Sequence, residues 1–229
     1  MAWKSSDAAS CAASARPVDP AASPVIPAAL LVFCLTLGVL CGRRLARGLP
    51  GAFRPTGTLV LAALVAAGLA AQLAAPWLLA AFGRDAAAIE ADGSWWRLLT
   101  ALFLQDGGLA GGAFNLAALV LVGAAAERLW GTAVLLALYF GCGIAAGVVA
   151  LGWQPTGAGN SIAILGLCGA IQAFGLRRGP DAPTTLLAAA GLAGGIALAN
   201  LRDVHGAALL TGAAAGIALP PPAAGDHAP

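Results

Sequence analysis

Long apolar runs, separated by short polar stretches, fill the chain from residue 25 to residue 219. The first run covers about 25–42 and the second covers 55–83, and neither contains a charged residue. Runs of this length are long enough for a helix that spans the hydrocarbon core of a bilayer, and they lack the strict alternation of a transmembrane β-strand. The pattern therefore predicts transmembrane helices.

The same pattern resumes after a mixed stretch at 84–106, where charged residues accompany two adjacent tryptophans. A third helix is predicted at about 110–128. The uncharged run 129–176 is too long for one span, and Pro155 with its neighbouring glycines divides it into a fourth and a fifth helix. A sixth helix is predicted at about 184–200 and a seventh at about 204–219.

The composition agrees with a lipid environment. Hydrophobic residues make up 60% of the 229 residues and charged residues 10%, and the mean hydropathy is +0.87. A soluble domain of this size has too small an interior to bury so much apolar surface. The net charge of +2 comes from basic residues in loops, which gives no support for nucleic-acid binding. We predict an all-α polytopic membrane protein whose immediate surrounding is the lipid bilayer.

The basic residues indicate an orientation. Four arginines follow the first apolar run, so this run is not a cleavable signal peptide, and the first helix is expected to enter from outside. With this topology seven basic residues lie inside and five outside. Residues 1–24, rich in Ala, Ser and Pro, are expected to be a disordered tail, and 220–229 a short C-terminal tail.

Two polar residues stand where apolar helices are predicted to begin. Ser161 opens the fifth helix and His205 opens the seventh, so both enter from the outer side at the same depth. An ionisable residue in such a segment indicates function by default, and a serine that meets an imidazole can act as a nucleophile with its base. Ala208, Gly212 and Gly216 continue the face of His205 and permit close helix approach. We therefore expect the two side chains to meet.

These residues resemble the rhomboid family of intramembrane serine proteases. Gly159-Asn160-Ser161 is similar to the family's GxS nucleophile motif, and Asp203-Val204-His205 to the segment that carries its histidine base. Other matching positions are Trp95-Trp96-Arg97, Asn115 of the HxxxN motif and Glu127-Arg128. The resemblance covers about 57–219 and implies a six-helix bundle, preceded here by one extra transmembrane helix at 25–42.

The resemblance implies an intramembrane serine endopeptidase in a bacterial cell membrane, which cleaves transmembrane or juxtamembrane segments of other membrane proteins. Ser161 would attack the carbonyl with His205 as base, without an acidic third member. The backbone at Ser161 and the side chain of Asn115 would hold the oxyanion, with Gly159 in support. No cofactor and no metal site is implied. Water is expected to reach the dyad through a cavity under the 84–106 loop.

The chain also departs from the family pattern. Gly111 replaces the histidine of HxxxN, and loss of one oxyanion donor typically lowers the rate by ~10²–10³. Ile162, Leu165 and Ala208 also differ from the residues usual at their positions. These departures favour an alternative function, a catalytically weak or inactive rhomboid-like protein that binds and escorts membrane-protein segments.

Simpler roles remain open for the same residues. Ser161 is also a suitable N-cap, His205 is a suitable partner for Asp203, and Asn115 can bond a neighbouring helix. Glu127-Arg128 is typical of a helix end. Four of the five cysteines lie in apolar runs without a CxxC pair, which indicates packing. A small transporter would need a continuous polar path, which the mid-membrane Ala, Gly, Leu and Val residues do not provide.

Overall fold

A computed structural model of the protein describes residues 25–221. The predicted tail at 1–24 and residues 222–229 of the predicted tail at 220–229 lie outside the described residues, as do Cys11 and His227. The elements are, in chain order, α1 (Val25–Arg47), α2 (Thr56–Ala74), α3 (Trp77–Phe82), β1 (Arg84–Asp85), α4 (Ala86–Asp92), α5 (Arg97–Thr100), the 3₁₀ helix η1 (Ala101–Phe103), α6 (Gly108–Trp153), β2 (Thr156–Gly157), α7 (Ser161–Arg178), α8 (Ala182–Asn200) and α9 (Val204–Ala218).

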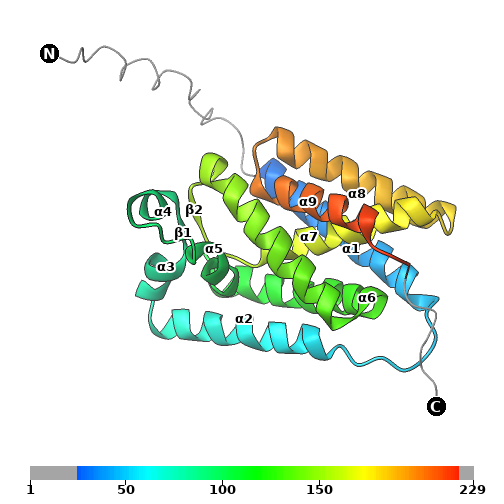
Figure 1. The fold of residues 1–229 in the computed structure, drawn as a ribbon, viewed down its shortest axis with the longest axis horizontal. Coiled ribbons are helices and arrows are strands. Elements are labelled where there is room, and N and C mark those ends of the chain that lie inside the picture. Colours follow the sequence, from blue (N-terminus) through cyan, green and yellow to red (C-terminus); the bar gives the residue numbers. More distant parts are fainter. Residues whose placement is uncertain (1–24, 222–229) are drawn as a thin grey trace, which may run out of the picture.

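The long helices form one bundle, and the short elements gather at one end of it. In Figure 1, α3, α4, α5 and the two strands lie at the left, while the long helices extend to the right. Helix α7 packs against α1, α6, α8 and α9, and every residue from Ile162 to Gly175 is buried. The helix that begins with Ser161 is therefore the centre of the bundle.

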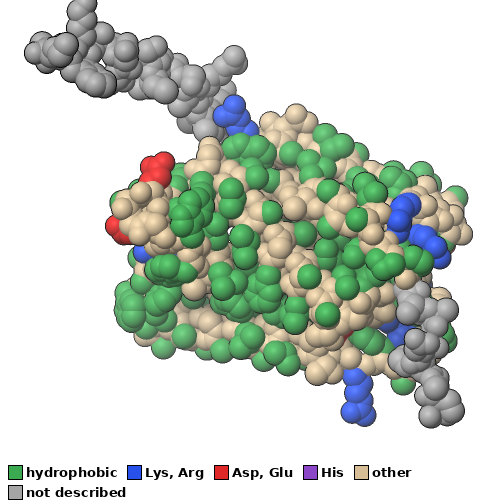
Figure 2. All heavy atoms as spheres, viewed as in Figure 1, with side chains coloured by type: hydrophobic (Ala, Val, Ile, Leu, Met, Phe, Trp, Pro, Cys, Tyr) green, Lys and Arg blue, Asp and Glu red, His purple; other side chains and the backbone are tan. Residues whose placement is uncertain are grey.

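The described helices suit a membrane. Helices α1, α2, α6 and α8 are long and apolar enough to cross one, and α9 is a shorter apolar helix. Helix α6 has 46 residues and bends at Gly131, where φ is 81° and ψ is 169°, so it provides two crossing segments. The face shown in Figure 2 carries many hydrophobic side chains, with the clearly visible acidic side chains at the left end and most of the visible basic side chains toward the right. The predicted class, an all-α polytopic membrane protein, is confirmed.

Three details of the predicted helices were wrong. The apolar run 55–83 does not form one helix: α2 ends at Ala74 and α3 begins at Trp77. Pro76 lies between them and has no amide hydrogen to continue the helical ladder. Helix α1 continues past residue 42 to Arg47. Its last turn contains Arg44 and Arg47, and basic residues at this position interact favourably with the helix dipole. Glu127-Arg128 does not end a helix, because α6 runs on to Gly131 before it bends.

Glu127 instead holds the beginning of α2. Its buried carboxylate accepts hydrogen bonds from the backbone amides of Gly57 (2.8 Å) and Thr58 (2.9 Å). It also accepts bonds from the hydroxyls of Thr58 and Thr132, both at 2.7 Å. Amides in a first helical turn lack partners within the helix, and Pro55 at the N-cap provides none. Glu127 therefore caps α2 from a helix distant in sequence.

Glycines bring α7 and α9 into backbone contact. A Cβ atom added to Gly212 would collide with the carbonyl oxygen of Gly166, and one added to Gly169 would collide with that of Leu209. Gly216 meets the carbonyl of Ala170 in the same way. The close approach predicted from the small residues of α9 is therefore confirmed. It brings together the two helices that begin with the candidate serine and histidine.

Candidate active site

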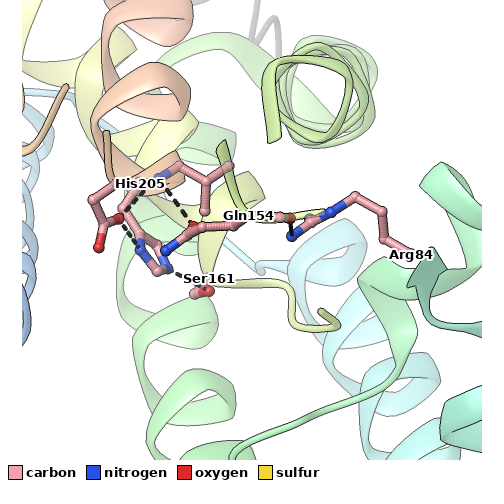
Figure 3. A network of polar contacts seen from close by, with 6 residues as sticks. Arg84, Gln154, Ser161 and His205 are labelled. Carbon is pink, nitrogen blue, oxygen red and sulfur yellow. Dashed lines mark hydrogen bonds and ion pairs between the residues drawn. The ribbon is translucent and has the colours of Figure 1, made fainter. Parts of the chain in front are cut away.

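Ser161 and His205 lie together at one end of the bundle. Ser161 is the first residue of α7, and His205 is the second residue of α9. The Oγ atom of Ser161 lies 2.8 Å from Nε2 of His205 (Figure 3). This distance is within the range in which a histidine can take the proton of a serine nucleophile. The two side chains thus meet as the sequence predicts.

Asp203 lies on the other side of the imidazole. Its Oδ1 atom is 2.7 Å from Nδ1 of His205, and the same atom accepts a hydrogen bond from the His205 backbone amide at 2.9 Å. Asp203 is the N-cap of α9, so one carboxylate both caps the helix and contacts the ring. Burial alone would raise the pKa of Asp203, but its hydrogen bonds to the ring and the backbone amide of His205 oppose burial, and the pKa lies below the usual aspartate range.

The simpler roles of Ser161 as an N-cap and of His205 as a partner of Asp203 do not account for the contact between the two side chains. The N-cap of α7 is Asn160, and the Ser161 hydroxyl bonds to His205. His205 does pair with Asp203, as the alternative expected, but it contacts the serine at the same time. The three side chains therefore form one continuous chain of contacts, Asp203–His205–Ser161.

A network of amides supports the residues around the serine. The Gln105 side chain accepts a bond from Asn115 Nδ2 (2.8 Å) and donates one to Asn160 Oδ1 (2.9 Å). The Gln105 backbone is held in turn by Gln72, which accepts from its amide at 2.9 Å and donates to its carbonyl at 2.7 Å. Gln105 is 1% exposed. It links α2, α6 and the start of α7, and no pattern in the sequence indicates this role.

Asn115 and Gly159 both lie near the serine. A Cβ atom added to Gly159 would stand 3.5 Å from Ser161 Oγ and 3.9 Å from Asn115 Nδ2. The Asn115 amide therefore borders the space beside the nucleophile, although its hydrogen bond to Gln105 also fits the simpler structural role. At Gly111 an added Cβ atom would meet no atom within 4 Å. The position that departs from the HxxxN motif thus faces open space.

A cavity of about 360 Å³ opens beside the candidate dyad. Ser161, His205 and Gly159 line one part of it, and Arg84 and Asp106 line another. Arg84 and Asp106 also border a second cavity. The first and second cavities therefore adjoin each other at the two ends of the 84–106 segment. This is the position from which water was expected to reach the dyad.

Arg84 and Gln154 fix the wall of this cavity (Figure 3). A terminal nitrogen of Arg84 donates to the carbonyls of Gln154 (2.9 Å) and Thr156 (3.2 Å). The side chain of Gln154 accepts a bond from the amide of Val204 at 3.2 Å. Strand β1 also pairs antiparallel with β2, with Arg84 opposite Gly157. The segment before Ser161 is thus tied both to β1 and to the start of α9, which sequence reasoning did not foresee.

Other chemistry has little support in the described part of the chain. Between residues 25 and 221, no three His, Cys, Asp or Glu side chains gather where they could hold a metal ion. The cysteines in this range, Cys34, Cys41, Cys142 and Cys168, are buried and free, which agrees with a packing role. The contacts that stand out chemically are those of the Asp203–His205–Ser161 chain.

Comparison with known proteins gives two matches. Residues 92–223, more than half of the chain, match the rhomboid domain. Rhomboid protease GluP of Bacillus subtilis (strain 168) is 42% identical over 94 residues, which are 41% of this chain and 18% of that protein. The matched segment thus spans less than a fifth of that relative's length. No solved structure matches significantly.

Proposed function

Since the chain belongs to the rhomboid family, we propose that it is an intramembrane serine endopeptidase. The observation that carries this proposal is the 2.8 Å contact between Ser161 Oγ and His205 Nε2. The substrates are transmembrane or juxtamembrane segments of other membrane proteins, because the serine opens the central helix of a membrane bundle and borders a cavity at its end.

In the proposed reaction, the Ser161 hydroxyl attacks the carbonyl carbon of the scissile peptide. Its proton moves to Nε2 of His205 as the new C–O bond forms, and the same nitrogen then protonates the leaving amine. Water from the adjoining cavity attacks the acyl-enzyme with His205 again as base. The cycle returns the serine hydroxyl and releases the new carboxylate.

Asp203 acts as a positioning residue in this scheme. When Nδ1–H of His205 donates to Asp203, the neutral ring must leave Nε2 unprotonated, and Nε2 is then able to accept the serine proton. The carboxylate also stabilises the imidazolium that forms during attack. The site thus differs from the dyad without an acidic member that the resemblance implied.

The oxyanion is held on the side of Asn115. An amide nitrogen carries two hydrogens, and Asn115 uses one for Gln105, so the second is available to a developing negative charge beside Gly159. Gln105 sets the orientation of the Asn115 amide group. Oε1 of Gln105 can only accept a hydrogen bond, so the Asn115 nitrogen, and not its oxygen, must face Gln105. The backbone amide of Ser161 is the other proposed donor.

Purified protein in liposomes with a transmembrane reporter tests this function. The wild type is expected to cleave the reporter within or next to its membrane segment, whereas Ser161→Ala and His205→Ala are not. Equal cleavage by the wild type and Ser161→Ala would assign the activity to a contaminant. Absence of cleavage by a folded wild type would favour the alternative, a binding and escort protein, for which the departure at Gly111 is the specific observation.

Gly111→His is expected to raise the turnover of this reporter. The added imidazole lies one helical turn before Asn115 and enters open space, so it restores a second side-chain donor without a collision. One such donor contributes ~10²–10³ in rate in comparable hydrolases, and we expect a gain of about tenfold or more. Gly111→Phe fills the same space without a hydrogen-bond donor and is the control. If both variants change the rate equally, the donor argument is wrong.

A further inference from the structure

Three arginines surround a third cavity, at the end of the bundle away from the serine. This cavity has a volume of about 360 Å³ and lies between α1 and α6. Arg43 and Arg47, four residues apart on α1, line it from one side, and Arg128 of α6 lines it from the other. No carboxylate lines it among the described residues. Three positive charges therefore face one small space.

The acidic residues Glu127, adjacent to Arg128 in sequence, and Asp181, the partner of Arg44, bond to groups outside the cavity. Glu127 directs its carboxylate to the amides of Gly57 and Thr58 at the start of α2. Asp181 pairs with Arg44, which does not line the cavity. The side chains of Arg43 and Arg47 have no hydrogen bond or ion pair with another described residue, and both residues are exposed. The charges in the cavity thus have no protein counterion in the part of the chain that the structure describes.

Arg128 is held in place by the segment after α1. Its Nε atom donates to the Ala46 carbonyl (3.2 Å), and one terminal nitrogen donates to the carbonyls of Leu49 (2.6 Å) and Gly51 (3.2 Å). Its guanidinium also lies 5.4 Å from the centre of the Phe53 ring. These contacts leave its other terminal nitrogen for a further acceptor. A fixed guanidinium is well suited to bind a phosphate oxygen.

The remaining wall of the cavity is apolar and continues onto the exposed surface of α6. Leu121, Ala124 and Ala125 line it from α6, at the spacing of one helix face. Leu121 is 50% exposed, although it belongs to a membrane-spanning helix. A free phosphate ion would use the arginines alone, whereas a phospholipid would use both the arginines and this apolar face.

We propose that this arginine cavity binds the phosphate group of an anionic phospholipid, whose acyl chain lies along Leu121. Basic cavities between transmembrane helices are known sites for anionic head groups. The lipid would bridge α1, which precedes the matched rhomboid domain, to α6 within it. The proposal is independent of the proteolytic function, because the cavity shares no residue with the candidate active site.

Lipid retention by the full chain tests the proposal. The protein is reconstituted with equal amounts of phosphatidylglycerol and phosphatidylcholine of the same acyl chains, purified in mild detergent, and analysed by native mass spectrometry. The wild type is expected to retain phosphatidylglycerol about tenfold over phosphatidylcholine, because phosphatidylglycerol has a net negative charge, whereas the choline cation neutralises the phosphate of phosphatidylcholine and is repelled by the same arginines. Arg43→Gln with Arg47→Gln is expected to abolish this preference.

Arg177→Gln with Arg178→Gln is the matched control, since it removes the same charge from the end of α7 without touching the cavity. The proposal fails if this control loses the preference as much as the cavity variant, which would indicate a diffuse surface field. It also fails if the wild type has no preference, or if glycerol 1-phosphate displaces the lipid at equal concentration. Equal melting temperatures of wild type and cavity variant in phosphatidylcholine would show that the variant is folded.

Discussion

Asp203→Asn is expected to lower kcat/KM for a transmembrane reporter by ~10²–10⁴, because an asparagine can hold the imidazole in the wrong tautomer. In the structure Asp203 Oδ1 lies 2.7 Å from Nδ1 of His205, and it also caps α9 at the His205 amide. Asparagine caps a helix about as well as aspartate does. The substitution therefore removes the ring partner while it retains the cap.

A spectroscopic measurement separates positioning from structural support. The sequence contains two histidines, so ¹⁵N-histidine labelling of a His227→Gln protein reports on His205 alone. The parent is expected to carry its proton on Nδ1, whereas Asp203→Asn should lose this single tautomer. Asp203→Glu, which keeps a carboxylate, should recover part of both the tautomer and the activity. Unchanged tautomer and rate in a folded Asp203→Asn protein would limit Asp203 to its capping role.

Gly212→Ala is expected to lower the thermal unfolding temperature sharply and to abolish activity. The added methyl group would collide with the Gly166 carbonyl, which belongs to the backbone of the central helix and cannot rotate away. Overpacking of this kind typically costs about 1–3 kcal/mol or more of the free energy of unfolding. Because α9 carries His205, displacement of α9 also moves the base away from Ser161.

Gly141→Ala is the matched control for this substitution. Gly141 also lies within a helix, but an added Cβ atom would meet nothing within 4 Å. Alanine favours a helix over glycine by roughly 1 kcal/mol, so this variant should unfold at the same or a higher temperature and keep its activity. Equal unfolding temperatures for the Gly212 and Gly141 variants would contradict the backbone contact between α7 and α9.

The placement of Ser161 beside His205 could be predicted from the sequence, and the reason is topological. Two helices that enter the bilayer from the same side begin at the same depth, and the glycines of α9 permit contact between them. Asp203 was recognised as a possible partner of His205. Its double contact could not be predicted, because one oxygen bonds both a backbone amide and a ring nitrogen, and this depends on the backbone conformation at the start of α9.

The supporting network could not be predicted in this way. The partners of Gln105 lie 10, 33 and 55 residues away in sequence, and no periodicity connects them. In the sequence, Arg84 is one of several charged residues in the mixed stretch 84–106, but in the structure it is 7% exposed and bonds the carbonyls of Gln154 and Thr156 before the nucleophile. Predictions of where helices end were wrong for local reasons. At Pro76, for example, the helix is interrupted although the apolar run 55–83 contains no charged residue. Hydropathy identifies spans, whereas polar contacts depend on tertiary packing.

Labelling with a fluorophosphonate probe tests the account most directly, because it reports the reactivity of the serine without a substrate. Detergent-solubilised wild type is expected to be modified covalently, with the added mass on the peptide that contains Ser161. Ser161→Ala should not be labelled, and His205→Ala should be labelled far more slowly because the base at 2.8 Å is lost. A folded wild type that remains unlabelled, or labelling that persists at another residue in Ser161→Ala, would contradict the proposed serine protease.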